Sequence, residues 1–350
     1  MKSKESFKRA TICTGVAICL IAQTAAQNAE NKAVTFGIAI ENDSFSGTDQ
    51  NYTNGTKLSW DFAKAETYED IPHLPKWAKS VSKLRKERPT PYTFGATISL
   101  GQKIFTPSNK EATELLVDER PYAGWTYLSL ALRETKKNHT DTFEITAGVV
   151  GPDSYAEDIQ NWVHEKIGSQ EALGWDNQLK NEIGGILTWQ RDTRLIELPN
   201  DSTGWGTDFN TSFGASVGNI YTHALLGANL RFGYNRQAAI SSPRIRPANT
   251  GVFPSGPEDA RLQIGKPDFG FFLTLGAEGR YVGRNLFIEG NTWADSHGLE
   301  LEHQVGDYYA GLTLLSRRWS LSYLYTVRSA EFPGQDEPHE FGGLTITRTF

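Results

Sequence analysis

The sequence has very little cysteine and methionine. Its two cysteines, Cys13 and Cys19, both lie near the start of the chain, so no disulfide can hold the rest together. Small secreted scaffolds commonly need such bridges, whereas a large closed β-structure does not. The single methionine contrasts with 9 Trp, 13 Tyr and 18 Phe, and this composition favours strands and interfaces over helical cores.

The sequence also lacks a long apolar run. TICTGVAICLIA follows the basic segment MKSKESFKRA and is shorter than the ~20 residues that a spanning helix needs. We predict that residues 1–26 are a signal peptide, with Thr24 and Ala26 at the small-residue positions before the cut, and a membrane anchor is the alternative. Removing its four basic residues and one acidic residue lowers the formal net charge from −6 to −9. Such an acidic exported chain is not expected to bind nucleic acid.

Apolar and polar residues alternate along most of residues 27–350, which is the period of a half-buried strand. In DFNTSFGASV, Phe209, Phe213 and Val217 share one face, and Asp208 and Ser212 share the other. The inward faces of such strands carry many Gly, Ser and Thr residues and few charges. A wide aqueous pore lined with charge is therefore not expected.

The connections between the strands differ in length. Gly218–Tyr221 and Val282–Arg284 resemble tight turns, whereas residues 235–267 and 331–338 are long and polar. Short turns at one end and long loops at the other are typical of outer-membrane barrels, and a last strand ending on Phe350 is typical as well.

We therefore predict an all-β fold in which residues 27–350 form a single antiparallel outer-membrane β-barrel. It should have 12 strands, or 14 if residues 193–199 form a strand of their own. A secreted β-sandwich or jelly roll is the alternative. Strand parity places residues 64–92 on the periplasmic side, where the basic stretch 76–88 is either a short amphipathic helix or a solvated spacer.

One segment, GPDSYAEDIQNWVHEKIGSQ, has a helical period. We predict a helix over about residues 153–168 in an extracellular loop, capped by Asp153 or Ser154 and ended by Gly168. Its apolar residues Ile159, Trp162, Val163 and Ile167 recur at helical spacing, and His164 lies on an adjoining face. By strand parity this helix lies at the same outer rim as the polar triplet Glu41-Asn42-Asp43, which follows an alternating strand. The triplet could form a polar turn or a site.

Several motifs of this chain together resemble, in order and spacing, the lipid A 3'-O-deacylase family of Gram-negative outer membranes. The matching segments are AIENDSF, NYTNG, LGQKIFTPS, DERPYAGW, VGPDSYAEDIQNWVHEKIG and WDNQLKNE, spread from about residue 34 to residue 185. The resemblance implies a 12-stranded barrel in the outer membrane, with the active site between the barrel wall and the loop helix. It further implies a monomer that acts on lipopolysaccharide.

The resemblance also implies calcium-dependent hydrolysis of the 3'-linked acyloxyacyl ester of lipid A. His164 would be the general base, since an imidazole has a suitable pKa. Asn42, Asp43 and Thr53 match the other catalytic positions. Glu41, Asn42 and Asp43 would supply hard oxygen ligands for Ca²⁺, which would polarise the ester carbonyl.

The substrate-binding residues match less closely. The family has an adjacent Lys-Arg pair after the third strand, whereas here Lys110 is followed by Glu111. Arg120 is a candidate for binding a lipid A phosphate, with a rim ion pair as the alternative. Glu171 is a candidate for the family's glutamate after the histidine, and Gln170 lies equally close. Tyr52 and Trp125 could be ordinary residues of the aromatic girdle.

Two other functions compete with this one. A porin or structural barrel would explain the alternation alone. A different lipid acyl hydrolase could use a serine nucleophile, for which Ser44 is the candidate.

Overall fold

The computed structural model describes residues 34–43, 51–71, 74–80, 92–136, 138–199, 203–235, 240, 242–249, 253 and 269–350. The predicted signal peptide and Ser44 lie outside these residues. The described chain is mostly β-strand, because alternating sequences of this kind present one apolar face and one polar face. Its strands are β1 (Val34–Asn42), β2 (Asn51–Ala65), β3 (Thr93–Thr106), β4 (Ala123–Thr135), β5 (His139–Val150), β6 (Glu182–Pro199), β7 (Trp205–Gly218), β8 (Tyr221–Tyr234), β9 (Phe269–Asn285), β10 (Gln304–Ser316), β11 (Trp319–Arg328) and β12 (His339–Thr349).

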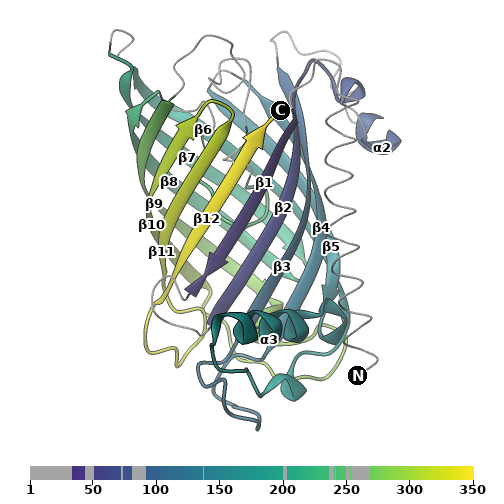
Figure 1. Cartoon of the computed structure of the whole chain (residues 1–350). Coiled ribbons are helices and arrows are strands. Elements are labelled where there is room, and N and C mark those ends of the chain that lie inside the picture. The colour runs from purple at the N-terminus through teal and green to yellow at the C-terminus, as the bar shows by residue number, and fades with distance from the viewer. Residues whose placement is uncertain are drawn as a thin grey trace.

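These strands form one closed antiparallel barrel in which each strand pairs with its neighbours in sequence and β1 pairs with β12 (Figure 1). The closing register runs from Thr35 opposite Thr349 to Asn42 opposite Gly342. Residues 193–199 continue β6, so the described part of the chain has 12 strands, not 14. The predicted turn at Val282–Arg284 is wrong, because these residues lie inside β9 and pair with β8.

The helical elements are short. They are the 3-10 turns η2 (Tyr68–Asp70), η4 (Pro152–Ser154) and η5 (Trp175–Asn177), and the α-helices α2 (Lys76–Ser80), α3 (Ala156–Ile167) and α4 (Leu286–Glu289). Within the described residues, none of the helices has the length and apolar character that crossing a membrane requires. Of the basic stretch 76–88, residues 76–80 are helical and the remainder lies outside the described residues.

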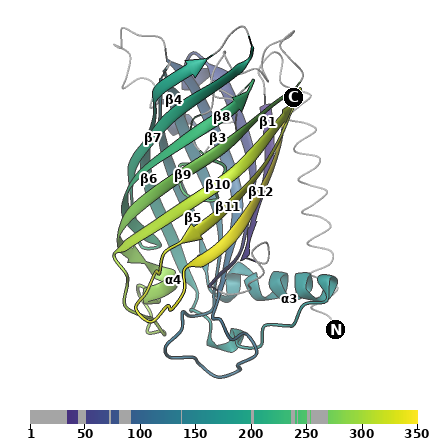
Figure 2. The same cartoon turned by 90° about the vertical axis from the view of Figure 1, so that its left-hand side faces the viewer.

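We call the end of the barrel that carries α3 and α4 the helix end, and the opposite end, where β12 finishes, the C-terminal end (Figures 1 and 2). Side chains alternate between the lumen and the outer wall, as predicted. In β7, Asp208 and Ser212 are buried in the lumen, while Phe213 and Val217 are 41% and 61% exposed on the outer wall. Many other large apolar residues are exposed in the same way, which gives the apolar outer surface of a membrane barrel.

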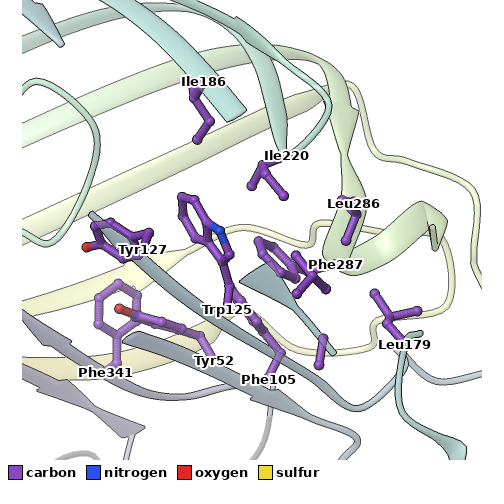
Figure 3. Packing of buried hydrophobic residues seen from close by; sticks show 12 residues of the cluster. Tyr52, Phe105, Trp125, Tyr127, Leu179, Ile186, Ile220, Leu286, Phe287 and Phe341 are labelled. Carbon is purple, nitrogen blue, oxygen red and sulfur yellow. The ribbon is translucent and has the colours of Figure 1, made fainter. Parts of the chain in front are cut away.

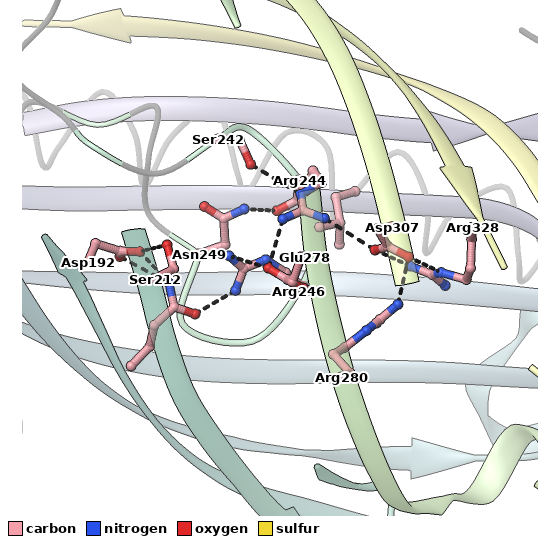
Figure 4. Close-up of polar contacts among 12 residues, drawn as sticks. Asp192, Ser212, Ser242, Arg244, Arg246, Asn249, Glu278, Arg280, Asp307 and Arg328 are labelled. Atoms are coloured by element: carbon pink, nitrogen blue, oxygen red, sulfur yellow. Dashed lines mark hydrogen bonds and ion pairs between the residues drawn. The ribbon is translucent and has the colours of Figure 1, made fainter. Parts of the chain in front are cut away.

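The lumen contains far more charge than predicted. Asp307 accepts hydrogen bonds from Arg280, Arg328 and Arg244, and Arg244 also binds Glu278 (Figure 4). The prediction failed because the sequence pattern counts charges per strand and does not show that opposite charges from different strands meet. Buried charges are tolerated when they are paired in this way.

Part of this charge comes from residues 242–249, which we call the luminal segment. They belong to the connection that follows β8, which ends at the C-terminal end of the barrel. Arg246 binds Gln190 and Glu278, and the Ala248 N–H donates to Glu144 at 3.2 Å. The segment thus crosses the lumen and pairs with several strands of the wall.

Towards the helix end, aromatic residues fill the lumen (Figure 3). Trp125 stacks on Tyr127 with ring centroids 4.4 Å apart, and Phe105 stacks on Phe287 at 4.3 Å. The interpretation of Trp125 and Tyr52 as girdle residues is therefore wrong, since both are 2% exposed and point inward. This cluster and the luminal segment together fill the barrel at two levels.

Candidate active site

The polar triplet at the end of β1 does not share one face. Strand alternation turns Glu41 into the lumen, where it is 4% exposed, and turns Asn42 to the outer wall. Asp43 follows the strand and is fully buried. The triplet therefore contributes Asn42 to the outer side of the helix end and Glu41 to the interior, with Asp43 buried just beyond the strand.

A β-bulge shapes the start of β2. The register between β2 and β3 shifts between Tyr52 and Asn54, so Thr53 is the extra residue. Its hydroxyl lies 2.7 Å from that of Thr106 at the end of β3. Bulges redirect side chains at strand ends, and this one leaves Thr53 buried beside β3 while Asn54 pairs with Asn42.

The outer wall of β3 and β4 provides the seat of α3. Gln102 and Thr126 both donate to the backbone oxygen of Ser154, at 2.9 and 2.8 Å. Gly124 makes room for the helix, because a Cβ at this position would lie 2.1 Å from the Cβ of Ala156. Polar groups on two strands and a glycine thus hold the start of α3 against the barrel.

The helix starts later than predicted, and its buried face is not the apolar one that carries Trp162 and Val163. It begins at Ala156, and Ser154 does not cap it, because Ser154 belongs to η4 and its carbonyl is bound by the strands. The predicted end is confirmed, since Gly168 adopts a left-handed conformation with φ +71° and closes the helix onto the His164 carbonyl.

The buried stripe of α3 is Ala156, Gln160 and His164, spaced four residues apart. Gln160 accepts a hydrogen bond of 3.0 Å from the indole of Trp175, which fixes the middle of the stripe. Trp162, in contrast, is 52% exposed. The apolar face that the sequence indicated therefore points away from the barrel, and the histidine points towards it.

Hydrogen bonding defines the chemical state of His164. Its Nδ1 lies 2.5 Å from the backbone oxygen of Gln170, and a carbonyl can only accept, so Nδ1 carries the proton. The other nitrogen, Nε2, is then left with its lone pair, as a general base requires. His164 is 5% exposed. Burial is the main cause that lowers the pKa of His164 below its usual value, and the positive charge of Lys110 lowers it further.

Two groups oppose this lowering. The hydrogen bond with Gln170 and the negative charge of Glu171 both raise the pKa of His164. The charges of Lys110 and Glu171 thus act on the imidazole in opposite directions. The main effect on Lys110 itself is burial, which lowers its pKa, while the charge of Asp43 raises it.

Lys110 therefore interacts with both His164 and Asp43, although these residues come from α3 and from the end of β1. Its backbone explains how it is positioned: the Lys110 carbonyl accepts from the N–H of Leu173 at 2.8 Å and from the Tyr122 hydroxyl at 3.2 Å. These bonds join the β3–β4 connection to the segment after α3. Sequence reasoning did not identify Tyr122, Gln160 or Trp175 as supports, because none carries a motif of its own.

Arg120 does not join this group. It is 1% exposed on the interior side, where it contacts Glu331 and the Phe287 carbonyl at 3.5 Å each and lies over the ring of Phe105. The structure thus differs from both readings of Arg120, the phosphate ligand and the rim pair with neighbouring acids. The charge of Arg120 is satisfied within the packed interior.

The oxygen atoms at the end of β1 could supply some, but not all, of the ligands that a calcium ion needs. Among the described residues, no three His, Cys, Asp or Glu side chains are grouped to hold a metal. The Glu41 carboxylate already accepts hydrogen bonds from Tyr52 and Ile245 inside the lumen. Asn42 and Asp43 remain as adjacent hard donors on the site's side, and backbone carbonyls could complete their set.

Comparisons with known proteins agree with this architecture. The family model described as "Outer membrane protein LpxR" matches residues 12–350. The solved structure of LpxR from Salmonella typhimurium aligns with a TM-score of 0.72 at 17% identity, covering 90% of this chain and 100% of that one. The β-domain of the Bordetella autotransporter BrkA aligns with a TM-score of 0.40 at 8% identity, covering 91% of this chain and 98% of that one. No curated protein matches the sequence significantly. Because the family model spans nearly the whole chain, this protein belongs to the family of the outer membrane protein LpxR.

Proposed function

We propose that this protein hydrolyses the 3'-linked acyloxyacyl ester of lipid A in the outer membrane, with a water activated by His164. One observation carries the proposal: a buried histidine with its Nδ1 proton held by the Gln170 carbonyl faces a polar site on the outer wall of a barrel of this family. The fixed tautomer leaves Nε2 as a base. The site also lies where an acyl chain in the membrane could reach it.

One group, the His164 imidazole, can serve first as the base and then as the acid of this reaction. Nε2 of His164 takes a proton from water, and the water oxygen attacks the ester carbonyl carbon. The bond between that carbon and the 3'-oxygen of the sugar breaks, and the imidazolium returns the proton to this oxygen. The products are a free acyloxyacyl acid and a 3'-hydroxyl group.

Other residues bind and orient the substrate. The Asn42 amide and the Thr53 hydroxyl, both neutral, would donate hydrogen bonds to the carbonyl oxygen. Lys110 would bind an anionic group of lipid A, and Glu171, which is exposed, would accept a hydrogen bond from a sugar hydroxyl. Arg120 has no part in this proposal, because it is buried among interior residues.

Asn42 and Asp43 would hold a calcium ion, which when bound would polarise the ester carbonyl. Glu41 is left out of this ligand set, since its carboxylate is bonded on the lumen side. We further propose that the protein acts as a monomer and that the helix end faces the cell exterior.

The exposed face of α3 supports a lipid substrate. Tyr155 and Trp162 are 57% and 52% exposed on the side away from the barrel. Aromatic side chains of this kind settle at membrane interfaces, where one end of the ring system is apolar and the other is hydrated. The helix would therefore lie at the level of the lipid headgroups, with His164 on its inner side.

Mass spectrometry of lipid A from a Gram-negative host that expresses this chain tests the proposal. We expect the wild type to remove one acyloxyacyl unit, and His164→Ala to lose at least about 100-fold of this activity, the range of general acid–base catalysis. His139→Ala is the matched control, since His139 begins β5 at the C-terminal end of the barrel, opposite to the end that carries α3. Purified protein with a calcium chelator should lose activity and regain it when calcium is restored.

Two results would count against the proposal. Intact lipid A with a folded wild-type protein in the outer membrane would remove the reaction. Equal activity of wild type and His164→Ala would keep the reaction and assign the base to another residue.

A further inference from the structure

Glu41 and Tyr52 lie on the lumen side of the two strand ends that carry the candidate site. The Tyr52 hydroxyl donates to Oε2 of Glu41 at 2.8 Å, and both side chains are almost fully buried. Glu41 directly precedes Asn42, and Tyr52 directly precedes Thr53. One buried hydrogen bond therefore links the backbone on either side of the β1–β2 connection at the residues next to the site.

The luminal segment supplies the second contact to this carboxylate. The backbone N–H of Ile245 donates to Oε1 of Glu41 at 2.6 Å, so both oxygens of Glu41 are engaged. Ile245 is 4% exposed and is held in place by its neighbour Arg244, which binds Glu278 and Asp307 (Figure 4). A chain segment from the far end of the barrel thus reaches the strand that ends in Asn42 and Asp43.

Two glycines make this arrangement possible. The register partners of Glu41 are Gly55 on β2 and Gly343 on β12. A Cβ at Gly55 would lie 1.9 Å from the Tyr52 hydroxyl oxygen, and one at Gly343 would lie 3.2 Å from Cγ of Glu41. Glycine weakens a strand interior and commonly marks a place where other groups approach closely. The space on both sides of Glu41 is therefore shaped for the Tyr52–Glu41 contact.

We propose that Glu41 and Tyr52 are positioning residues for the hydrolysis. Glu41 is bound by the Ile245 N–H of the luminal segment and by Tyr52. From the lumen side of the wall, the pair holds Asn42, Asp43 and Thr53 in the reactive arrangement. Neither residue touches the substrate. Because successive strand residues point to opposite faces, fixing Glu41 in the lumen fixes the orientation of Asn42 outside. This role rests on the proposed deacylase function.

Tyr52→Phe is the first test, because it removes the hydroxyl and keeps the ring that packs on Phe105 and Phe341. Tyr127→Phe is the matched control: Tyr127 is buried in the same aromatic cluster, but it belongs to β4 and not to the strands joined by the β1–β2 connection. Displacements of about 1 Å can reduce turnover about 100-fold, so we expect kcat of Tyr52→Phe to fall about 10- to 100-fold. Its KM should stay within about twofold, since the substrate-binding groups are unchanged.

Amide hydrogen exchange gives a readout that does not depend on activity. Peptides covering residues 39–43 and 51–55 should exchange faster in Tyr52→Phe than in wild type, and remain unchanged in Tyr127→Phe. Glu41→Gln should behave like Tyr52→Phe, because an amide cannot accept on both of its terminal atoms. The pH profile of all three variants should keep its acid limb, since His164 is untouched.

The possible outcomes distinguish failure of the positioning role from failure of the proposed deacylase function. Wild-type kinetics and exchange in Tyr52→Phe and Glu41→Gln, with an active wild type, would overturn the positioning role alone. Faster exchange with unchanged kcat would show a merely structural bond and overturn it as well. A folded wild type without deacylase activity would overturn the proposed function, and this role with it.

Discussion

At the scale of the residue, the burial of His164 has a consequence for the pH dependence of activity. Burial, as the main cause, and the charge of Lys110 lower the pKa of His164 below its usual value of 6.5. A base works only when it is neutral. Activity should therefore persist as the pH falls to 6.5 and decline only below that value, and the acid limb of kcat/KM against pH measures this directly.

The charges around His164 allow a paired prediction. Lys110→Met removes a positive charge that lowers the pKa of His164, so the acid limb should move to higher pH. Glu171→Gln removes a negative charge that raises this pKa, so the limb should move to lower pH. Lys136→Met, at the opposite end of β4, is the control and should leave the limb in place. Shifts of both site variants in the same direction would contradict the electrostatic interpretation.

The residue scale also shows what sequence reasoning could and could not reach. Motif order along the chain pointed to residues whose charges influence one another. The charges of Lys110 and Glu171 act on the pKa of His164, and the charge of Asp43 acts on the pKa of Lys110. Arg120 differs because its partner Glu331 is 211 residues away, and no local pattern reveals such a pair. The same limit applies to Glu41, whose partner Ile245 lies 204 residues along.

At the scale of the element, α3 depends on its close contact with β4. The contact of Gly124 with Ala156 and Ser154 leaves no room for a side chain. We expect Gly124→Ala to displace the start of α3 and to reduce deacylation at least about 10-fold, because His164 moves with the helix. Gly279→Ala is the control, since a Cβ there meets nothing within 4 Å.

The barrel itself should survive the Gly124→Ala change. Its migration in unboiled gels should match that of wild type, since the ladders on both sides of β4 remain. Full activity of Gly124→Ala would show that the helix adjusts without moving the histidine.

The periodicity of apolar residues predicted where strands and helices lie. It did not predict which face of α3 is buried or where this helix begins. Alternation located the strands because one side of each faces an apolar medium, and the helical period located α3. The helical spacing grouped the apolar residues of α3, Trp162 and Val163 among them, on one face, and both are exposed in the structure. The structure buries Gln160 and His164, and Trp175 of η5 donates a hydrogen bond to the Gln160 side chain. In a membrane setting, an apolar face need not point to the protein.

At the scale of the whole molecule, the filled lumen bears on the porin alternative. The luminal segment crosses the barrel, and Arg244 and Arg246 bind it to Glu278 and Asp307 of the wall. We expect wild-type protein in planar bilayers to show no large steady conductance. In the double variant Arg244→Ala, Arg246→Ala, residues 242–249 should exchange their amide hydrogens faster than in wild type, since breaking buried ion pairs costs about 3–5 kcal/mol and releases the segment. The aromatic cluster should still keep this variant from conducting.

Arg191→Ala is the control for this experiment. It breaks an ion pair of similar length with Asp141, but the Arg191 side chain is 39% exposed, so little should change. A large steady conductance of the wild type would favour the porin function over the hydrolase.

The position of α3 on the outside of the wall has a last consequence, which concerns kinetics. Under the proposed function, the substrate reaches His164 by diffusing sideways within its own leaflet, and no path through the protein is involved. Encounter then depends on how densely lipid A covers the surface, not on its amount per volume. In detergent micelles, adding inert detergent at constant lipid A concentration should therefore slow the reaction, as surface dilution predicts, and a soluble esterase acting on a dispersed ester would show no such effect.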